Sequence, residues 1–225
     1  MIRRRAVMSW SSGKDSAYAL HVARVSGALD VVALLSTVNE SVDRVSMHGV
    51  RRSLLERQAE ALGLPLLTVE LPDPCTNEVY EARMAAFVER ARAMGVEAMI
   101  FGDLFLEDIR AYRESRLEGT GIEAVFPIFG RDTKELAESM WREGIVATLT
   151  TVDTRVVPEA LVGRRWDRAL VEAFPEGVDP CGENGEFHSF VSDGPGFSRP
   201  IAIEVGEVVR RDPFVYADLF EAQRP

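Results

Sequence analysis

The sequence predicts an α/β protein in which a doubly wound, mostly parallel sheet is followed by a smaller α+β lobe. Over roughly the first hundred residues, short apolar runs alternate with amphipathic stretches of helical spacing. This alternation is typical of right-handed βαβ units, whose strands form a parallel sheet. Past residue 104 it loosens, and after Pro158 two segments alternate apolar and polar residues like antiparallel strands. We therefore expect two domains, residues 1–130 and 131–225.

The first domain is expected to contain buried strands with helices between them. Strands are expected over residues 5–9, 30–37, 64–71 and 96–103. Helices are expected over residues 14–25, 50–62 and 77–94. The last two helices are followed by Gly63 and Gly95, because glycine readily adopts the left-handed conformation that ends a helix.

Further helices and strands are expected in the second half of the chain. Helices are expected over residues 106–118, 133–143 and 165–173. Strands are expected over residues 122–128, 144–153, 186–194 and 199–212. The turn Asp-Gly-Pro-Gly at residues 193–196 predicts that the last two strands form an antiparallel pair.

Composition and charge restrict the function. The 225 residues carry 26 basic and 36 acidic side chains, a net charge of −10, which argues against a surface for long nucleic acids. No apolar run approaches the roughly 18 residues of a membrane span, and no apolar core of a signal peptide follows the basic N-terminus. We expect a cytoplasmic protein. Cys75 and Cys181 lie outside any CxxC pattern, which argues against a disulfide framework, a zinc site or an iron–sulfur cluster.

Residues 11–16, Ser-Ser-Gly-Lys-Asp-Ser, connect the first strand to the first helix. A small-residue turn at a helix N-terminus directs main-chain N–H groups at one point, which suits a phosphate. The loop is not a Walker A motif, because Asp15 replaces the Mg²⁺-binding Ser or Thr and no glycine lies five positions before Gly13. An ordinary turn rich in helix-capping residues is the simpler alternative.

Each side chain of this loop suits phosphate chemistry. Ser11, Ser12 and Ser16 offer hydroxyl groups, and the Gly13 region offers main-chain amides. Lys14 adds a positive charge. Asp15 is expected to hold Mg²⁺ or to cap the helix.

The loop resembles the SGGxDS pattern of PP-loop ATP pyrophosphatases, with serine at the second position. Three further blocks, residues 46–66, 101–114 and 179–197, make the chain similar to the diphthine–ammonia ligase family. This resemblance implies a HUP-type fold and ATP-dependent amidation. In that reaction a carboxylate of diphthine, the modified histidine of elongation factor 2, is adenylated and then attacked by ammonia. AMP and pyrophosphate are released, with ATP and Mg²⁺ as cofactors and ATP, ammonium and elongation factor 2 as partners.

The resemblance also assigns roles to individual residues. Residues 11–16 would bind the triphosphate, with Lys14 and Asp15 catalytic. Ser36 and Thr37 would lie near the adenosine, His48 near a phosphate, and Gly102 and Asp103 at the same sheet edge. Glu183 and Glu186 would face the acceptor or the ammonium ion. Asn184 and His188, which replace Gly and Glu of the family motif, are expected with Glu186 at the acceptor.

Several alternatives stay open at this point. The chain could act on a different carboxylate, or it could be an ATP-sensing module that does not turn ATP over. A tRNA-modifying or sulfur-transfer enzyme would need a basic surface and paired cysteines, which the sequence lacks. His48 could be a surface residue at a helix start, Asp103 a turn residue or helix cap, and Arg51 and Arg52 a solvated helix face. Homo-oligomer formation is left open.

Overall fold

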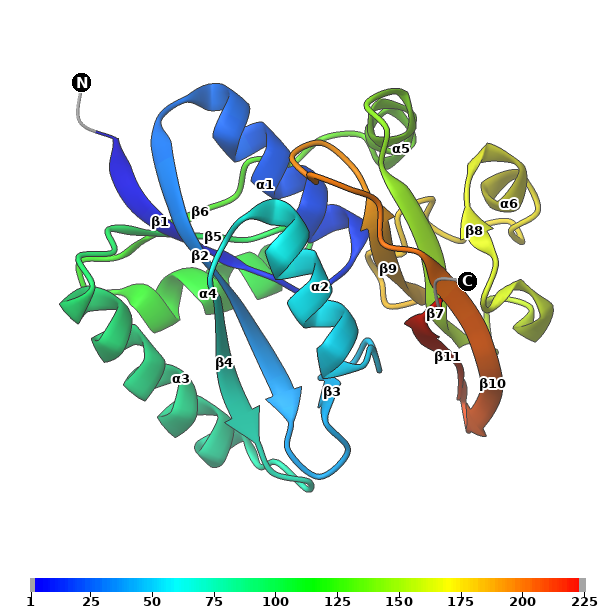
Figure 1. The fold of residues 1–225 in the computed structure, drawn as a ribbon, viewed down its shortest axis with the longest axis horizontal. Helices are drawn as coiled ribbons and strands as arrows, with labels where there is room; N and C mark the ends of the chain where they lie inside the picture. The colour runs from blue at the N-terminus through cyan, green and yellow to red at the C-terminus, as the bar shows by residue number, and fades with distance from the viewer. Residues whose placement is uncertain (1–2, 223–225) are drawn as a thin grey trace.

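The first sheet of the computed structural model, which describes residues 3–222, is mostly parallel. Its parallel strands are β1 (Arg4–Ser9), β2 (Leu29–Asn39), β4 (Leu66–Leu71), β5 (Ala98–Ile100) and β6 (Glu123–Val125). They lie in the order β4-β2-β1-β5-β6, and the short β3 (Arg44–Val45) runs antiparallel to β2 (Figure 1). The doubly wound α/β fold is therefore confirmed.

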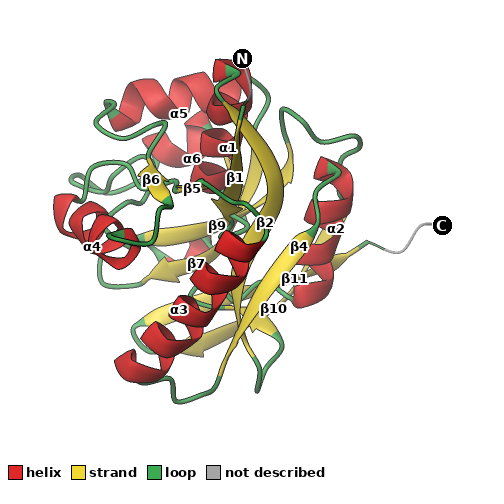
Figure 2. Cartoon of the chain, turned by 90° about the vertical axis from the view of Figure 1, so that its left-hand side faces the viewer, coloured by secondary structure: helices red, strands yellow, loops and turns green. Residues whose placement is uncertain are grey.

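Helices cover both faces of this sheet because successive strand residues point to opposite sides. The helices are α1 (Lys14–Ser26), α2 (Arg52–Leu62), α3 (Asn77–Ala93) and α4 (Glu107–Leu117). On one face, Met8 and Leu34 pack in a core with residues of α1 and α2. On the other face, Val7 and Leu35 pack in a second core with Phe87 of α3 and its neighbours. Figure 2 shows α3 lying against the sheet.

A second, antiparallel sheet is built around β7 (Val146–Asp153). The strands β8 (Arg165–Trp166), β9 (Phe187–Asp193) and β11 (Phe214–Glu221) each pair with β7, and β10 (Ile203–Arg211) pairs with β11. The helices of this part are α5 (Thr133–Arg142), the short 3₁₀ helix η1 (Glu159–Leu161) and α6 (Arg168–Glu172). This sheet confirms the smaller α+β lobe, whereas the domain division at residue 130 stays a prediction.

Several elements differ from those expected. The strands at 187–193 and 203–211 do not pair with each other, since β9 pairs with β7 and β10 with β11. The helix expected over 165–173 begins only at Arg168, because Trp166 is buried in β8 opposite Ala147 and Asp167 caps the helix. The strands β3 and β11 were not predicted, and β5 and β6 are shorter than expected.

The two sheets share one core and are joined by buried hydrogen bonds. Gln58 of α2 is fully buried; it accepts from the indole N–H of Trp10 at 2.8 Å and donates to the main-chain oxygens of Ser12 at 3.0 Å and Val191 at 2.6 Å. The main-chain N–H of Val191 in β9 also donates to the Ser12 oxygen, at 2.9 Å. The loop after β1 is therefore held from both sheets.

The basic cluster near His48 is neutralised by ion pairs, of which those to Asp218 connect the two sheets. Asp218 of β11 accepts from Arg44 at 2.9 Å and from Arg51, which hold the pKa of that carboxyl below its ordinary value. Arg52 pairs with Glu70 at 2.7 Å and with Asp43. Arg51 and Arg52 are thus paired side chains, not a freely solvated helix face.

None of the helices between residues 3 and 222 is long and apolar enough to cross a membrane.

We predict that Gln58→Ala lowers the free energy of unfolding by about 2–4 kcal/mol, because it removes the side-chain partner of the buried Trp10 N–H and of the Val191 oxygen, and one of the two donors to the Ser12 oxygen. Glu56→Ala, on the exposed side of the same helix, is the matched control and should change stability by less than about 0.5 kcal/mol. Urea denaturation measures both. An equal loss of unfolding free energy in the two variants would contradict the prediction that the hydrogen bonds of Gln58 stabilise the fold.

Candidate active site

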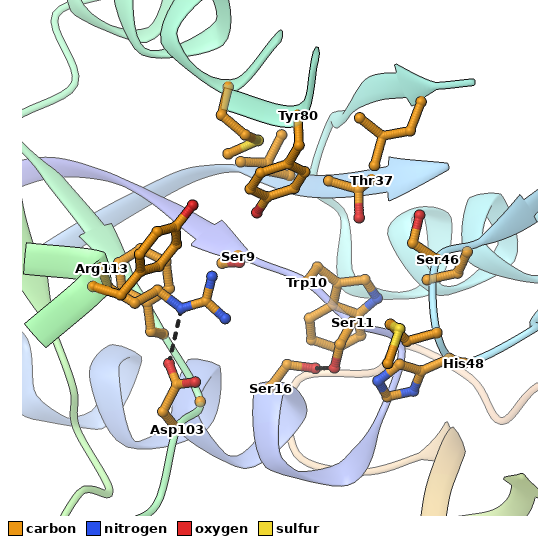
Figure 3. Close-up of a pocket in the computed structure, with 18 of the residues that line it drawn as sticks. Ser9, Trp10, Ser11, Ser16, Thr37, Ser46, His48, Tyr80, Asp103 and Arg113 are labelled. Carbon is orange, nitrogen blue, oxygen red and sulfur yellow. Dashed lines mark hydrogen bonds and ion pairs between the residues drawn. The ribbon is translucent and has the colours of Figure 1, made fainter. Parts of the chain in front are cut away.

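A cavity of about 820 Å³ lies where β1, β2, β4 and β5 end. Residues at or just past the carboxyl ends of these strands line it, among them Trp10, Thr37, Leu71 and Phe101. The first turn of α1, the facing helices α3 and α4, and residues 182–189 of the second lobe complete the wall (Figure 3). In doubly wound sheets, ligands bind at this edge, at the point where successive connections leave to opposite faces.

Most of the residues expected at the site line this cavity. They are Ser11, Lys14, Asp15, Ser16, Thr37, His48, Gly102, Asp103, Glu183 and His188. The other expected residues, which do not line it, are Ser12, Gly13, Ser36, Asn184 and Glu186.

The start of α1 presents a free main-chain donor beside the cavity. The main-chain N–H of Ser16 has no hydrogen-bond partner among residues 3–222, and the helix cap Gly13 has no side chain to satisfy it. The Ser11 and Ser16 hydroxyls lie 3.2 Å apart and both face the cavity (Figure 3). This arrangement suits an anion with several oxygens.

Lys14 is part of the loop but is nearly enclosed by protein. Its Nζ contacts the Asp15 carboxylate at 2.9 Å and the main-chain oxygen of Cys181, and it lies 5.1 Å from the centre of the Phe187 ring. Burial by itself lowers the pKa of Lys14, but the neighbouring acidic groups, Asp15 foremost with Cys181 and Asp179, together outweigh this and the pKa is raised. The lysine is therefore charged, and its charge joins the loop to the second lobe.

Gly102 allows the end of β5 to approach the start of α1. A Cβ atom at this position would lie 2.9 Å from the main-chain nitrogen of Ser16 and 3.0 Å from the carbonyl carbon of Asp15. These distances are too short for any side chain, and the atoms in contact are main chain. Gly102 therefore acts through close packing, and Asp103 after it faces the cavity.

Ser36 and Thr37 are neighbours on β2, but their side chains lie in different surroundings. Thr37 lines the cavity, and its hydroxyl points into it (Figure 3). Ser36 is buried and donates to the main-chain oxygen of Trp10. The expectation that Ser36 contacts adenosine is therefore replaced by a role in holding the start of the loop.

Glu186 lies inside its own loop instead of on the cavity. It is buried, and its carboxylate accepts from the main-chain N–H of Asp179 at 3.1 Å and from the main-chain and side-chain nitrogens of Asn184, both at 2.9 Å. Asn184 is exposed and donates to this carboxylate. The two residues expected at the acceptor thus hold the shape of residues 179–186.

Glu183 is the carboxylate of this loop that faces the cavity. One of its oxygens accepts from the main-chain N–H of Leu104 at 2.7 Å. Burial raises the pKa of Glu183 to about 7; the N–H of Leu104 works against this rise, and the negative charges of Asp15 and Asp103 add to it. A carboxyl group that titrates near neutral pH can take up and release a proton during a reaction.

His48 and His188 pack against each other beside the loop, with ring centres 4.5 Å apart. The Nδ1 of His48 lies 3.3 Å from the main-chain oxygen of Ser189. Burial, and then the neighbouring His188, lower the pKa of His48 well below its ordinary value, and burial lowers that of His188 to about 4. Both rings are therefore neutral at pH 7 and offer hydrogen bonds without charge.

Several polar side chains that the sequence did not single out also line the cavity, and two of them are prominent. The Tyr80 hydroxyl of α3 and the Arg113 guanidinium of α4 both point inward (Figure 3). Arg113 lies in the block at residues 101–114 that carries the family resemblance, which was the one signal for it. Tyr80 gave no signal beyond its place on an amphipathic helix.

No group of three or more His, Cys, Asp or Glu side chains within residues 3–222 is arranged to hold a metal ion. Asp15 supplies one carboxylate at the cavity, and the ammonium group of Lys14 contacts both of its oxygens, at 3.1 and 2.9 Å. Mg²⁺ commonly takes one or two carboxylates and completes its shell with substrate phosphates and water, so Asp15 is the group of the loop that could bind the ion.

Comparisons with known proteins agree on one family. The model of the diphthamide synthase N-terminal domain matches residues 4–124, and that of the diphthamide synthase C-terminal domain matches residues 132–218. The chain is 24% identical to the diphthine–ammonia ligase of Bos taurus, over 92% of this chain and 85% of the relative. It is 25% identical to that of Homo sapiens, over 88% and 82%, and 25% identical to that of Danio rerio, over 91% and 88%.

We predict that Glu183→Gln changes how stability depends on pH. The pKa of Glu183 is raised from 4.5 to about 7, so between these pH values the folded protein holds a proton that the unfolded chain releases. The free energy of unfolding of the wild type therefore falls as the pH rises from about 4.5 to 7, and stays constant above that. The variant lacks this loss, so it should gain about 1–2 kcal/mol over the wild type between about pH 5 and pH 8, allowing for partial exposure. Urea denaturation at both pH values measures this. Glu172→Gln, at an exposed carboxylate, is the control; a pH-independent difference for Glu183→Gln would contradict the assignment.

Proposed function

The chain belongs to the diphthamide synthase family, and on that basis we propose that it is an ATP-dependent amide ligase. It adenylates a carboxylate and transfers ammonia to it, with release of AMP and pyrophosphate. The relatives are named diphthine–ammonia ligases, so the proposed acceptor is the diphthine carboxylate, carried on elongation factor 2. The observation that carries the proposal is that a phosphate-binding loop and a proton-exchanging carboxyl, Glu183, face one cavity.

ATP fits the cavity with its phosphates at the loop. The free N–H group of Ser16, with the hydroxyls of Ser11 and Ser16, suits the terminal phosphates. The deeper wall is apolar and suits the adenine; it is formed by Leu35, Leu71, Met84, Val88 and Met99. Thr37 lies beside this apolar part and is the proposed contact to the adenosine.

Mg²⁺ is proposed at Asp15, where it would neutralise charge on the triphosphate. The chain's own positive charge at the loop is Lys14, which is fixed by Asp15 and Cys181. The positive charge of Lys14 therefore attracts the phosphates through space, although its side-chain NH₃⁺ group need not contact the nucleotide.

Adenylation makes amidation feasible because AMP leaves far more readily than hydroxide from a carboxylate. The protein has to align the acceptor carboxylate with the α-phosphate and exclude water from the mixed anhydride. Ammonium must then lose a proton before its nitrogen can attack. Glu183 is the proposed proton acceptor, because its carboxyl titrates near neutral pH. The neutral rings of His48 and His188 border the same space and are proposed as hydrogen-bond partners of the acceptor.

The product of ATP cleavage tests the reaction. The protein is incubated with ATP labelled at the α-phosphate, Mg²⁺ and ammonium, with and without diphthine-bearing elongation factor 2, and AMP is separated from ADP. We expect AMP only with the factor. ADP would contradict cleavage at the α-phosphate. AMP that appears with a cell extract, and not with the factor, would keep the ligase chemistry and change the acceptor. No turnover in any mixture would favour an ATP-sensing module.

We predict that Ser11→Ala lowers the rate of AMP formation by about 10- to 100-fold, because a hydroxyl that donates to a charged phosphate is lost. Ser53→Ala, at an exposed serine of α2, is the matched control and should keep the wild-type rate. A rate for Ser11→Ala equal to that of the control would remove Ser11 from the nucleotide site.

A further inference from the structure

We propose that Arg113 binds a phosphate oxygen of the nucleotide through its two terminal nitrogens. This inference rests on the proposed use of ATP. It starts from the basic side chains that line the cavity, which are Lys14, Arg113 and Arg116. Lys14 is held by Asp15 and Cys181, and Arg116 pairs with Glu81. Arg116 uses a terminal nitrogen on Glu81, whereas Arg113 contacts Asp103 through its Nε alone and keeps both terminal nitrogens available.

The guanidinium of Arg113 makes one polar contact among residues 3–222. Its Nε donates to the Asp103 carboxylate at 3.3 Å, and its two terminal nitrogens have no partner there. The side chain is 29% exposed, and its guanidinium carbon lies 4.9 Å from the centre of the Phe101 ring. Figure 3 shows the terminal nitrogens turned into the cavity. The ring and Asp103 fix the group while leaving its donors available.

The charges around Arg113 favour an anionic ligand with more than one oxygen. The cavity is otherwise rich in acids; its lining carboxylates are Asp15, Asp73, Glu81, Asp103 and Glu183. A triphosphate entering such a space meets repulsion, so a cation facing it contributes strongly to binding. The planar guanidinium can donate two parallel N–H groups to a phosphate.

The position of Arg113 in the fold favours the nucleotide over the acceptor as the source of that anion. β1 and β5 are neighbours; β1 continues into the loop and α1 on one face, and β5 continues through Asp103 towards α4 on the other. Arg113 reaches from α4 to Asp103 at this switch point, where doubly wound folds bind nucleotides. The N-terminus of α1 and the guanidinium thus approach one space from opposite faces.

The competing explanation is that Arg113 serves only to neutralise Asp103. That role needs only the Nε contact and leaves the two terminal nitrogens without a function. The two explanations differ when Asp103 is also replaced. If neutralisation were the whole role, removing both partners would restore nucleotide binding; if Arg113 contacts phosphate, it would not.

Binding titrations of the full chain with ATP, AMP and adenosine test the proposal. We expect Arg113→Gln to weaken ATP about 10- to 100-fold and to leave adenosine unchanged, since adenosine lacks phosphate. Arg113→Lys should recover part of the affinity, because it keeps the charge but not the planar pair of donors. Arg110→Gln, on the same helix and paired with Glu114 away from the cavity, is the matched control and should bind ATP like the wild type.

The outcomes separate this inference from the proposed function. Wild-type affinity of Arg113→Gln for ATP would overturn the inference, as would an equal loss for ATP and adenosine, which would indicate a distorted wall. The double variant that carries both Arg113→Gln and Asp103→Asn should bind ATP as weakly as Arg113→Gln alone. Recovery of ATP binding in the double variant would also overturn the inference. Wild-type protein that binds ATP but forms no AMP would contradict the ligase reaction alone, and the titrations would still decide the role of Arg113. If AMP binds as tightly to Arg113→Gln as to the wild type while ATP is weakened, the contact is to a terminal phosphate.

Discussion

The main-chain oxygen of Ser12 accepts two hydrogen bonds, one from the N–H of Val191 and one from the side chain of Gln58, and the rest of the site depends on them. Ser12 has a φ of 70°, a left-handed conformation that costs a non-glycine residue of the order of 1 kcal/mol. It is also fully buried. The conformation persists because a strand of the other sheet and a fully buried amide hold it. This turn starts α1 so that the N–H of Ser16 has no internal partner, and that N–H is available to a phosphate.

The distribution of charge around the cavity follows from burial. Lys14 remains charged because it has Asp15 beside it, whereas His48 and His188 lack a carboxylate partner and are neutral. Glu183 is neither permanently charged nor permanently neutral, since main-chain N–H donors partly offset the rise in its pKa that burial causes. A group fixed as a cation, a pair fixed as neutral and a carboxyl poised to titrate occupy one cavity. Such separation of protonation states is typical of sites that move protons.

The sequence predicted correctly the elements that depend on local patterns, such as periodicity and turn residues. It was misleading for elements whose structure depends on contacts with distant parts of the chain. The strands and helices of the parallel sheet followed from periodicity, and residues 11–16 from a turn at a helix start. The hairpin expected around residues 193–196 was wrong because the turn is local, whereas the partner of β9 is β7, some forty residues earlier in the chain. Trp166 fits a helical pattern, but its burial against β7 draws it into a strand. Glu183 and Glu186 looked alike in the sequence, and only the path of the loop separates the one on the cavity from the one inside. Arg113 and Gln58 could not be found from spacing, because their partners lie on other elements.

The hydrogen bonds of Ser12 have a consequence for how the chain can be divided. Family models and sheet topology both suggest two halves, yet the loop encoded in the first half takes its shape from β9 in the second. A fragment ending near residue 130 would keep the loop residues and lose the strand that supports them. A protein assembled from the halves of two relatives would therefore have to form the hydrogen bonds among Ser12, Gln58 and Val191 across the junction, although these residues are far apart along the chain.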